Sequence, residues 1–559
     1  MPQARLSDLI TPLDVLRLYP PHQGAMLSML QSRASVLPHK EYLAFEGGSY
    51  TYAQVLDSVY RTAAVLVQQG VKAGDRVGVM SSNHPSSVFL ILALGQLGAI
   101  YVPVNPDYGM AEAKYVLEHA QVCGVVCAPA ALPTVQAACA AILPAPWLLV
   151  NQAAGSVGTA NLPAPAPTQA PTASPTPVLS ALMALASPLT TNVATPDRTC
   201  LFIYTSGTTG FPKGVMHSQR SLHTAGEGFV ARMYLQPDDR VLCVLPMFHI
   251  NAIFYSMAGS LAAGATLILE RKFSASSFWK TVKDTGATTV NTIAAASAIL
   301  MRRDRSEFVP GHALQKIYGA PFDEEIFRVF NDEFQVPILI EGYGMSEVPG
   351  ALNNPFLGLR KVRSMGPPSK HPDPAIQLAS LRICDDAGNF LQPGQTGELV
   401  VKTPIVMQGY YRDAAQTRAA FRDGWFLTGD LAWVDDDGYF WFVARKKDII
   451  RKRGENISGA ELDRIVGNHP AVLESAALPV PSDLGEDDIL VAVMLRDGMQ
   501  ASAQDIAGWC RQHLAAIKVP RYVVFVDALP HTPTHRVAKF KMRDDKTLLA
   551  RATDLQKLG

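Results

Sequence analysis

Apolar positions follow two different periods in the first part of the chain. Some stretches repeat an apolar residue every third or fourth position, which is typical of a helix with one buried face. Between them lie short apolar runs with the length of a buried strand. Alternation of strand and helix at this spacing predicts a parallel sheet covered by helices. We expect helices at 52–69, 85–97 and 111–120, and strands at 76–80, 99–104 and 124–127.

A second series of the same kind follows after an interruption. The segment 153–177 is rich in Ala, Pro, Thr and Gln, so we expect an exposed loop or insertion there. Binding of a polyproline-recognising partner is the alternative interpretation of this segment. After this segment we expect a strand that begins at Thr199 and further strands at 241–245 and 265–269. The alternation of strands and helices continues to Ile340.

The last third of the chain carries shorter elements. Short β segments with turn residues near 381–384 and 397–401 indicate a small antiparallel, barrel-like piece. From about Ile449 the pattern is that of a compact α+β unit. The sequence therefore predicts an α/β protein: a large N-terminal domain of helix-covered sheets with a small barrel-like β subdomain, and a small α+β C-terminal domain. The C-terminal elements are expected as helices at 460–468 and 503–516 and strands at 475–480 and 489–495.

Length and charge narrow the classes of function. A chain of 559 residues, 48% of them hydrophobic, is too long for one ordinary core, so at least two domains are expected. Lys+Arg and Asp+Glu both number 49, so no overall basic field favours nucleic acid as a partner. The seven cysteines are scattered, odd in number and form no CxxC pair, which favours reduced thiols over a disulfide framework.

No segment predicts export or membrane insertion. The N-terminus lacks a basic stretch followed by an apolar run. The longest apolar stretch, 88–104, is shorter than a usual membrane span and contains Gln96. We therefore expect a cytoplasmic protein without a membrane span, and the sequence leaves a homodimer open.

The strongest chemical signal is the string YTSGTTGFPKGV at 204–215. A hydrophobic strand runs into a loop whose glycines let backbone N–H groups approach phosphate oxygens. Thr205, Ser206, Thr208 and Thr209 add hydroxyl donors, and Lys213 adds a positive charge. The string is not a Walker A loop, because its lysine follows a proline and precedes a glycine. The alternative is a flexible connection between a strand and a helix.

With this string the chain resembles the adenylate-forming superfamily of acyl-CoA synthetases, firefly luciferase and peptide-synthetase adenylation domains. The resemblance covers nearly the whole chain, and the later motifs occur in the order of that family. Within it the chain is most similar to acyl-CoA ligases of the crotonobetaine/carnitine-CoA ligase group. The segments that indicate this group are 246–249, 273–279, 289–292 and 452–457.

The resemblance implies roles for the nucleotide-site residues. Thr208 and Lys213 would act on the phosphates, Glu347 with Thr205 would hold Mg²⁺, and Tyr343 would stack on adenine. On its own, the string GYGMSE at 342–347 is a plausible turn between a strand and a helix. The remaining residues expected to contact ATP are Ser206, Gly207, Thr209, Gly210, Gly319, Ala320, Pro321, Gly342, Gly344, Met345 and Ser346; Tyr318 stands where the family has a small residue.

The same resemblance implies a sugar site and an acid pocket. Asp430 is acceptor-only when ionised and suits the two ribose hydroxyls, and Arg445 would reach the same sugar or the phosphates. A turn aspartate and a solvated arginine are the alternatives. His249, with Ile250 nearby, would line the acid pocket and the channel for the thiol. A structural histidine is the alternative for His249.

The C-terminal part should be mobile in a protein of this family. Its rotation is expected at Lys447, which divides the chain into an N-terminal domain, 1–446, and a C-terminal lid, 447–559. The basic loop with Arg453, followed by Gly454 and Glu455, would then meet the phosphates of coenzyme A.

The last motif of the family departs from its pattern in this chain. Arg536 replaces the lysine that bridges the acid and the α-phosphate, and Lys539 is a second candidate for that role. An arginine keeps the positive charge but is longer and planar, so a slower first half-reaction is one expected consequence.

Together these motifs predict an AMP-forming ligase. ATP and a carboxylic acid would give an acyl-adenylate and diphosphate, and coenzyme A would then take the acyl group and release AMP. The partners are therefore a small carboxylic acid and coenzyme A, with Mg²⁺ as cofactor. The alternatives are transfer to a carrier protein, a luciferase-like oxygenase, and a non-catalytic nucleotide-binding protein.

Overall fold

The computed structural model forms two compact units. The first combines residues up to Thr205 with Pro212–Leu381 and Val401–Phe426, and the second is formed mainly by Arg382–Val400 and Leu427–Gly559. The structure describes residues 9–152, 176–205, 212–452, 455–482, 486–531, 537–543 and 545–557. Most of the Pro/Ala-rich segment 153–177 therefore lies outside the described residues.

The first unit contains a seven-stranded sheet in the order β17-β8-β7-β4-β3-β5-β6. Strands β3 to β7 run parallel, whereas β8 is antiparallel to β7 and to β17. The parallel strands expected from apolar runs are confirmed. The bounds are β3 (Arg76–Met80), β4 (Ile100–Val104), β5 (Gly124–Cys127), β6 (Trp147–Val150), β7 (Thr199–Thr205), β8 (Lys213–Ser218) and β17 (Gly409–Tyr410).

A second sheet of eight strands has the order β14-β13-β12-β11-β9-β10-β1-β2. Its inner strands are parallel, and β2 and β14 at the two edges are antiparallel to their neighbours. The bounds are β1 (Glu41–Phe45), β2 (Gly48–Thr51), β9 (Arg240–Cys243), β10 (Thr266–Leu269), β11 (Thr289–Asn291), β12 (Lys316–Gly319), β13 (Ile338–Met345) and β14 (Val348–Asn353).

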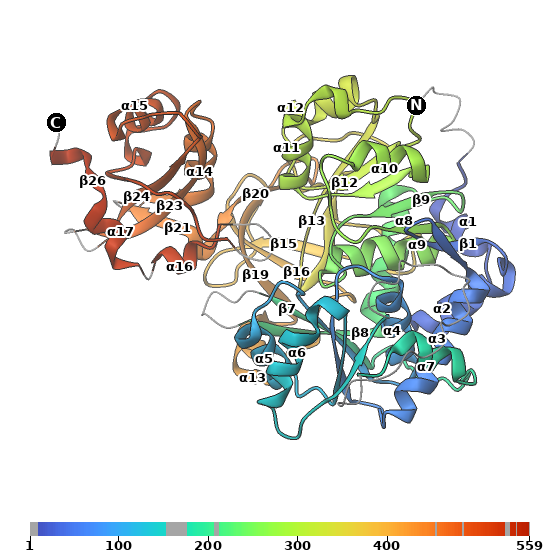
Figure 1. The fold of residues 1–559 in the computed structure, drawn as a ribbon. Helices are drawn as coiled ribbons and strands as arrows, with labels where there is room; N and C mark the ends of the chain where they lie inside the picture. Colours follow the sequence, from blue (N-terminus) through green and yellow to red (C-terminus); the bar gives the residue numbers. More distant parts are fainter. Residues whose placement is uncertain are drawn as a thin grey trace. The chain divides into compact units, whose positions relative to one another are not determined.

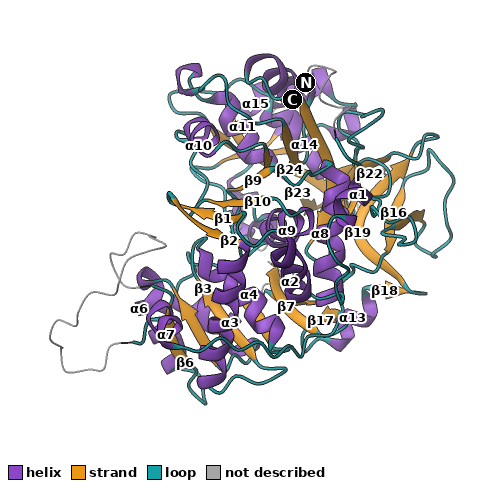
Figure 2. Ribbon diagram, turned by 90° about the vertical axis from the view of Figure 1, so that its right-hand side faces the viewer, coloured by secondary structure: helices purple, strands orange, loops and turns teal. Residues whose placement is uncertain are grey.

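Helices fill the space between the two sheets. Helix α4 contacts β4 and β7 of one sheet, α9 contacts β10 of the other, and α8 contacts both; Figure 2 shows α2, α8 and α9 between β10 and β7. Every residue of α4 is buried, as its uninterrupted apolar pattern predicts. The bounds are α2 (Met26–Val36), α3 (Tyr52–Gln68), α4 (Pro85–Gln96), α5 (Met110–His119), α8 (Gln219–Met233) and α9 (Ala258–Ala263).

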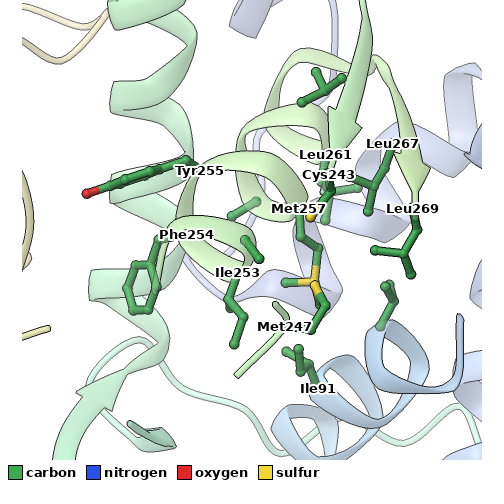
Figure 3. Packing of buried hydrophobic residues seen from close by; sticks show 14 of the residues in the cluster. Ile91, Cys243, Met247, Ile253, Phe254, Tyr255, Met257, Leu261, Leu267 and Leu269 are labelled. Carbon is green, nitrogen blue, oxygen red and sulfur yellow. The ribbon is translucent and has the colours of Figure 1, made fainter. Parts of the chain in front are cut away.

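The segment after β9 forms part of this core. A π-helical stretch, η3 (Asn251–Met257), leads into α9 and is buried over most of its length. Figure 3 shows Ile253 and Met257 among the apolar side chains around β10, while Tyr255 points away from that cluster. The π-helical stretch therefore turns some buried residues of one short segment toward β10 and others toward α8.

The second unit has an antiparallel sheet and a C-terminal α+β layer. Most of the antiparallel sheet, β15-β16-β19-β18 with β20 on β19, belongs to this unit. In the sheet β23-β24-β25-β26, alternate residues of β24 face two separate apolar clusters. Figure 1 shows α14 and α15 on one side of β24 and α16 and α17 on the other. The bounds are β15 (Ser380–Cys384), β16 (Gly397–Lys402), β18 (Phe421–Arg422), β19 (Trp425–Val434), β20 (Phe440–Arg445), β23 (Val472–Pro481), β24 (Asp487–Leu495), β25 (Tyr522–Phe525), β26 (Thr553–Asp554), α14 (Gly459–Gly467), α15 (Ala503–His513), α16 (Lys539–Arg543) and α17 (Lys546–Arg551).

Neither motif string connects a strand to a helix, which was the alternative interpretation of each. The string at 342–347 covers the end of β13 and the turn that leads into the antiparallel strand β14. Likewise β8, a strand, follows the loop after β7. In both places pairing with a neighbouring strand satisfies the backbone donors and acceptors, and a helix is not needed to do so. Among the described residues, no helix has the length and apolar character that crossing a membrane requires.

Candidate active site

A β-hairpin fixes both ends of the predicted phosphate loop. Thr205 and Lys213 are cross-strand partners at the open end of β7 and β8. Tyr204 Oη lies 2.8 Å from Nδ1 of His119, and the Tyr115 hydroxyl donates to the Pro212 carbonyl at 3.1 Å. The loop residues Ser206, Gly207, Thr208, Thr209 and Gly210 lie outside the described residues, so their roles stay predictions.

Tyr410 connects the lysine and the glutamate of the two main motifs. Strand β17 pairs with β8 so that Tyr410 is opposite Val215, and its ring centroid is 5.1 Å from Lys213 Nζ. The Tyr410 hydroxyl donates to Oε1 of Glu347 at 2.9 Å. Burial, together with the Glu347 carboxylate, raises the pKa of Tyr410, so its hydroxyl keeps its proton. Thus a cation and a carboxylate that are distant in sequence share one tyrosine.

Backbone contacts hold the turn between β13 and β14 against the hairpin. The Glu347 carbonyl accepts from the Met407 N–H at 2.8 Å, and the Ser346 carbonyl lies 2.7 Å from His217 Nε2. Residue His217 belongs to β8, and Met407 comes shortly before β17. The site is therefore built where three segments from different parts of the chain meet.

We predict that His217 makes this junction sensitive to acid. Burial lowers the pKa of His217 to about 4, so the unfolded chain binds the proton first as the pH falls. The free energy of unfolding should therefore decrease as the pH falls from about 6.5 to 4, by up to about 3 kcal/mol. When thermal unfolding is measured at a series of pH values, the melting temperature of His217→Gln should decrease less over this range than that of wild type. The exposed His39→Gln serves as control, and equal falls in all three proteins would contradict the prediction.

Glycines allow close packing on the predicted adenine side. A Cβ at Gly319 would lie 2.6 Å from the Phe322 ring, and one at Gly342 would lie 2.4 Å from the Tyr318 hydroxyl. Gly319 also pairs with Glu341 across β12 and β13, which sets the predicted adenine segment Gly319, Ala320 and Pro321 beside the GYGMSE strand. Tyr343, Gly344 and Met345 lie on β13 itself.

Glu341 is a supporting residue that sequence reasoning missed. Its carboxylate accepts from the backbone N–H groups of Phe322 at 2.8 Å and Arg363 at 2.9 Å. Burial raises the pKa of Glu341 to about 7, while the two backbone donors oppose that shift. The only signal in the sequence is an acidic residue at the end of the apolar run ILIE. Glu341 ties β13 to the adenine segment.

His249 lies between β9 and η3, as the family pattern implies. Asn83 anchors this segment: its side chain donates to the Leu245 carbonyl and accepts from the Met247 N–H, at 2.9 and 2.7 Å. The His249 ring contacts Phe248 with centroids 4.5 Å apart. Its role beside the acid stays a prediction.

The second unit holds the predicted ribose residues. Asp430 and Arg445 are cross-strand partners on β19 and β20, and Arg445 Nε lies 3.5 Å from Asp430 Oδ1. The Asp430 side chain is 6% exposed and that of Arg445 is 40% exposed. A buried carboxylate beside a partly exposed cation suits two hydroxyl donors, and the role of this pair at the ribose stays a prediction.

The expected hinge and final cation also lie in the second unit. Lys446 pairs with Asp386 and Glu398, whereas burial and the neighbouring Arg445 lower the pKa of Lys447. Rotation at Lys447 stays a prediction. Arg453, Gly454 and Arg536 lie outside the described residues, and Glu455 begins β22 (Glu455–Ser458).

Lys539 already has a partner. Its Nζ lies 2.5 Å from Asp463 Oδ2, and the other Asp463 oxygen accepts from the Ala477 N–H at 2.6 Å. This ion pair joins α16 to α14 within the second unit. Which of Arg536 and Lys539 replaces the lysine of the family stays a prediction.

A further titratable cluster surrounds Glu227 on α8. His22 and His223 lie 2.9 and 3.2 Å from its two oxygens, and His371 lies 3.3 Å away. Three of these residues are close enough to hold a metal ion. However, Nδ1 of His22 and of His371 accepts a backbone N–H, so the proton stays on the nitrogen that faces the carboxylate. We therefore interpret the cluster as a buried carboxylate held by imidazole donors.

The fold and this site together define a class of protein. Two helix-filled sheets carry a lysine hairpin and a glutamate turn, and a smaller unit carries a paired aspartate and arginine. Such an arrangement is that of a nucleotide-dependent, acid-activating enzyme. The chain belongs to the AMP-binding enzyme family, whose model matches residues 30–411, and the AMP-binding enzyme C-terminal domain matches residues 461–536.

Characterised proteins of this family are similar over almost their whole length. The sulfoacetate–CoA ligase of Cupriavidus necator is 30% identical over 522 residues, which is 92% of this chain and 97% of that protein. The crotonobetaine/carnitine–CoA ligase of Proteus mirabilis is 30% identical over 527 residues, covering 91% and 97%. A crystal structure of ATP-bound MatB from Rhodopseudomonas palustris has a TM-score of 0.80 at 26% identity, covering 93% of this chain and 98% of that one. The resemblance noted from the motifs is confirmed.

These findings establish the reaction class. The chain is an AMP-forming acyl-CoA synthetase, which activates a carboxylic acid with ATP and transfers the acyl group to coenzyme A.

Proposed function

We propose that Lys213, Tyr410 and Glu347 form the phosphate end of the ATP site and drive adenylate formation. The observation that carries this proposal is the single tyrosine that bonds Glu347 and lies under Lys213. Lys213 neutralises charge on the outer phosphates, and Tyr410 keeps the lysine and the glutamate at a fixed separation. Positioning and charge neutralisation are the main contributions a protein makes to this kind of transfer.

The donor set at this end of the site fits Mg²⁺. Glu347 offers carboxylate oxygen and Thr205 a hydroxyl, and both are the hard oxygen ligands that Mg²⁺ prefers. Thr205 is the cross-strand partner of Lys213, so it belongs to the same hairpin end. When bound, Mg²⁺ offsets charge on the departing diphosphate.

Two displacement steps follow from this assignment. A carboxylate oxygen of the acid attacks the α-phosphorus, and the bond to the diphosphate breaks. Arg536 offsets the charge that gathers at the α-phosphate. The sulfur of coenzyme A then attacks the acyl carbonyl, its proton passes to solvent, and the C–O bond to AMP breaks. Rotation at Lys447 exchanges the Arg536 loop for the loop with Arg453 between these steps.

A product assay tests the proposal. With a panel of acids, purified enzyme should release AMP and diphosphate and consume free coenzyme A thiol. We expect Lys213→Ala to slow adenylate formation about tenfold, because one phosphate-binding cation is lost. Release of ADP and orthophosphate would contradict the mechanism. Acid-dependent AMP release without loss of thiol would favour a carrier protein as acyl acceptor.

The identity of the final cation needs a separate pair of variants. Arg536→Ala should slow adenylate formation and leave thermal stability unchanged. Lys539→Ala should instead lower thermal stability, because it leaves the half-buried carboxylate of Asp463 without its partner. A Lys539→Ala protein that is stable but unable to form adenylate would reverse this assignment.

A further inference from the structure

Arg232 is a buried cation that has no carboxylate partner among the described residues. Its residue on α8 is 3% exposed, and Nη2 donates to the Gly350 carbonyl at 2.8 Å. Nε and Nη1 have no hydrogen-bond partner in the described part of the chain. Within that part, no carboxylate lies within 4.0 Å of the guanidinium. Burial of an unpaired charge is costly, so a missing partner of opposite charge is expected.

Two other lysine or arginine side chains are buried among the described residues, and one of them, Lys316, is in an ion pair. Lys316 Nζ lies 2.5 Å from Asp239 Oδ2. Arg33 donates to Ser32 and to a backbone carbonyl, at 3.2 and 2.8 Å; burial lowers the pKa of Arg33, and the Glu227 carboxylate opposes that shift. Arg33 Nε also lacks a hydrogen-bond partner among the described residues, whereas Arg232 has two such nitrogens, Nε and Nη1.

Aromatic rings enclose the guanidinium of Arg232. Its Cζ lies 5.0 Å from the ring centroid of Tyr255, 5.2 Å from that of Tyr318 and 5.6 Å from that of Phe229. The three rings also contact one another, with centroids 5.4 to 5.6 Å apart. The three rings belong to the buried core, and Figure 3 shows that Tyr255 extends away from the side chains around β10. Ring faces partly stabilise a cation and exclude water, which strengthens any ion pair formed there.

This group of side chains packs against the glycines of the nucleotide motif. A Cβ at Gly350 would lie 2.1 Å from the guanidinium, one at Gly344 would lie 2.8 Å from the Tyr255 hydroxyl, and one at Gly342 would lie 2.4 Å from the Tyr318 hydroxyl. These glycines belong to β13 and β14. The Arg232 guanidinium and its surrounding rings therefore pack directly against β13, which carries the GYGMSE motif, and against β14.

We propose that Arg232 pairs with a second acidic group on the acid substrate. The enzyme then takes small organic acids that carry a carboxylate or sulfonate in addition to the carboxylate that reacts with ATP. The inference rests on the proposed function, because it requires acid adenylation at this motif. The reacting carboxylate stays at the α-phosphate, and the second anion supplies the charge that Nε and Nη1 lack.

Matched pairs of acids test this substrate class. Propanoate is compared with malonate, butanoate with succinate, and acetate with sulfoacetate, using acid-dependent AMP release to obtain kcat/KM. Wild type should prefer the doubly acidic member of at least one pair by about tenfold or more. Arg232→Met should lower kcat/KM for that acid about 30-fold or more and leave the monoacid unchanged or improved. Arg220→Met, on the same helix but paired with the exposed Asp197, is the matched control.

Each outcome decides the inference. Preference of wild type for the monoacid in every pair overturns it, and so does an equal loss for both acids in Arg232→Met. If Arg232→Met does not fold, the wild-type ratios decide, and Arg232→Lys should keep part of the preference. AMP release with monoacids alone overturns the inference but supports the proposed function, whereas no AMP with any acid counts against both.

Discussion

Glu347→Gln should reduce adenylate formation about 100- to 1000-fold, the loss expected when a preorganised charge at a reacting phosphate is removed. The amide has the same size and can still accept the hydrogen bond from Tyr410, so the turn between β13 and β14 should stay folded. The measurement is acid-dependent exchange of labelled diphosphate into ATP at several Mg²⁺ concentrations.

Two variants separate charge from packing in this experiment. Tyr410→Phe removes the hydrogen bond but leaves the carboxylate, so we expect a smaller loss of about tenfold. The exposed Glu118→Gln removes a charge elsewhere and should have no effect. If Glu347→Gln exchanged diphosphate at the rate of Glu118→Gln, the assignment of Glu347 would be wrong.

Asp430→Ala should raise the KM for ATP by about 100-fold or more, because a carboxylate that accepts two hydroxyl groups contributes about 1.5 to 3 kcal/mol per bond. The sharper readout uses 2′-deoxy-ATP and 3′-deoxy-ATP. Wild type should discriminate against both analogues, and Asp430→Ala should use all three nucleotides about equally well. Steady-state kinetics of AMP release with one acid gives these ratios.

The control for this variant is Asp436→Asn, which changes an exposed turn on the same unit. It should keep the discrimination of wild type. An Asp430→Ala enzyme that binds ATP weakly but still rejects the deoxy analogues would show that the ribose contacts come from another residue.

Elements with a strong local signal were predictable from the sequence. Strands β3 and β5 have the predicted bounds, because each is an apolar run ended by polar or small residues. Helix α3 begins where expected, since Thr51 and Gln54 form a capping box at its start. The motif residues Lys213 and Glu347 were also recognisable, because each lies in a string of unusual composition.

Features that depend on distant pairing were not predictable. Tyr410 is 63 residues from Glu347 in sequence, and only the pairing of β17 with β8 brings it to the site. In the sequence, Arg232 looks like an ordinary charged residue in the last turn of a helix. No neighbouring residue indicates that its side chain is buried among aromatic rings. Helix α15 ends at His513 because the next residue, Leu514, is extended, although the apolar pattern continues.

The antiparallel pairing around the phosphate loop has a consequence for engineering. Lys213 follows its loop on a strand whose other neighbour, β17, is contributed by a segment near residue 410. A fragment carrying only the loop and its flanking strands would arrive in a host scaffold without the tyrosine that supports the lysine. Transplanting this nucleotide-binding function therefore requires two separate pieces of chain, and a single contiguous cassette would not be enough.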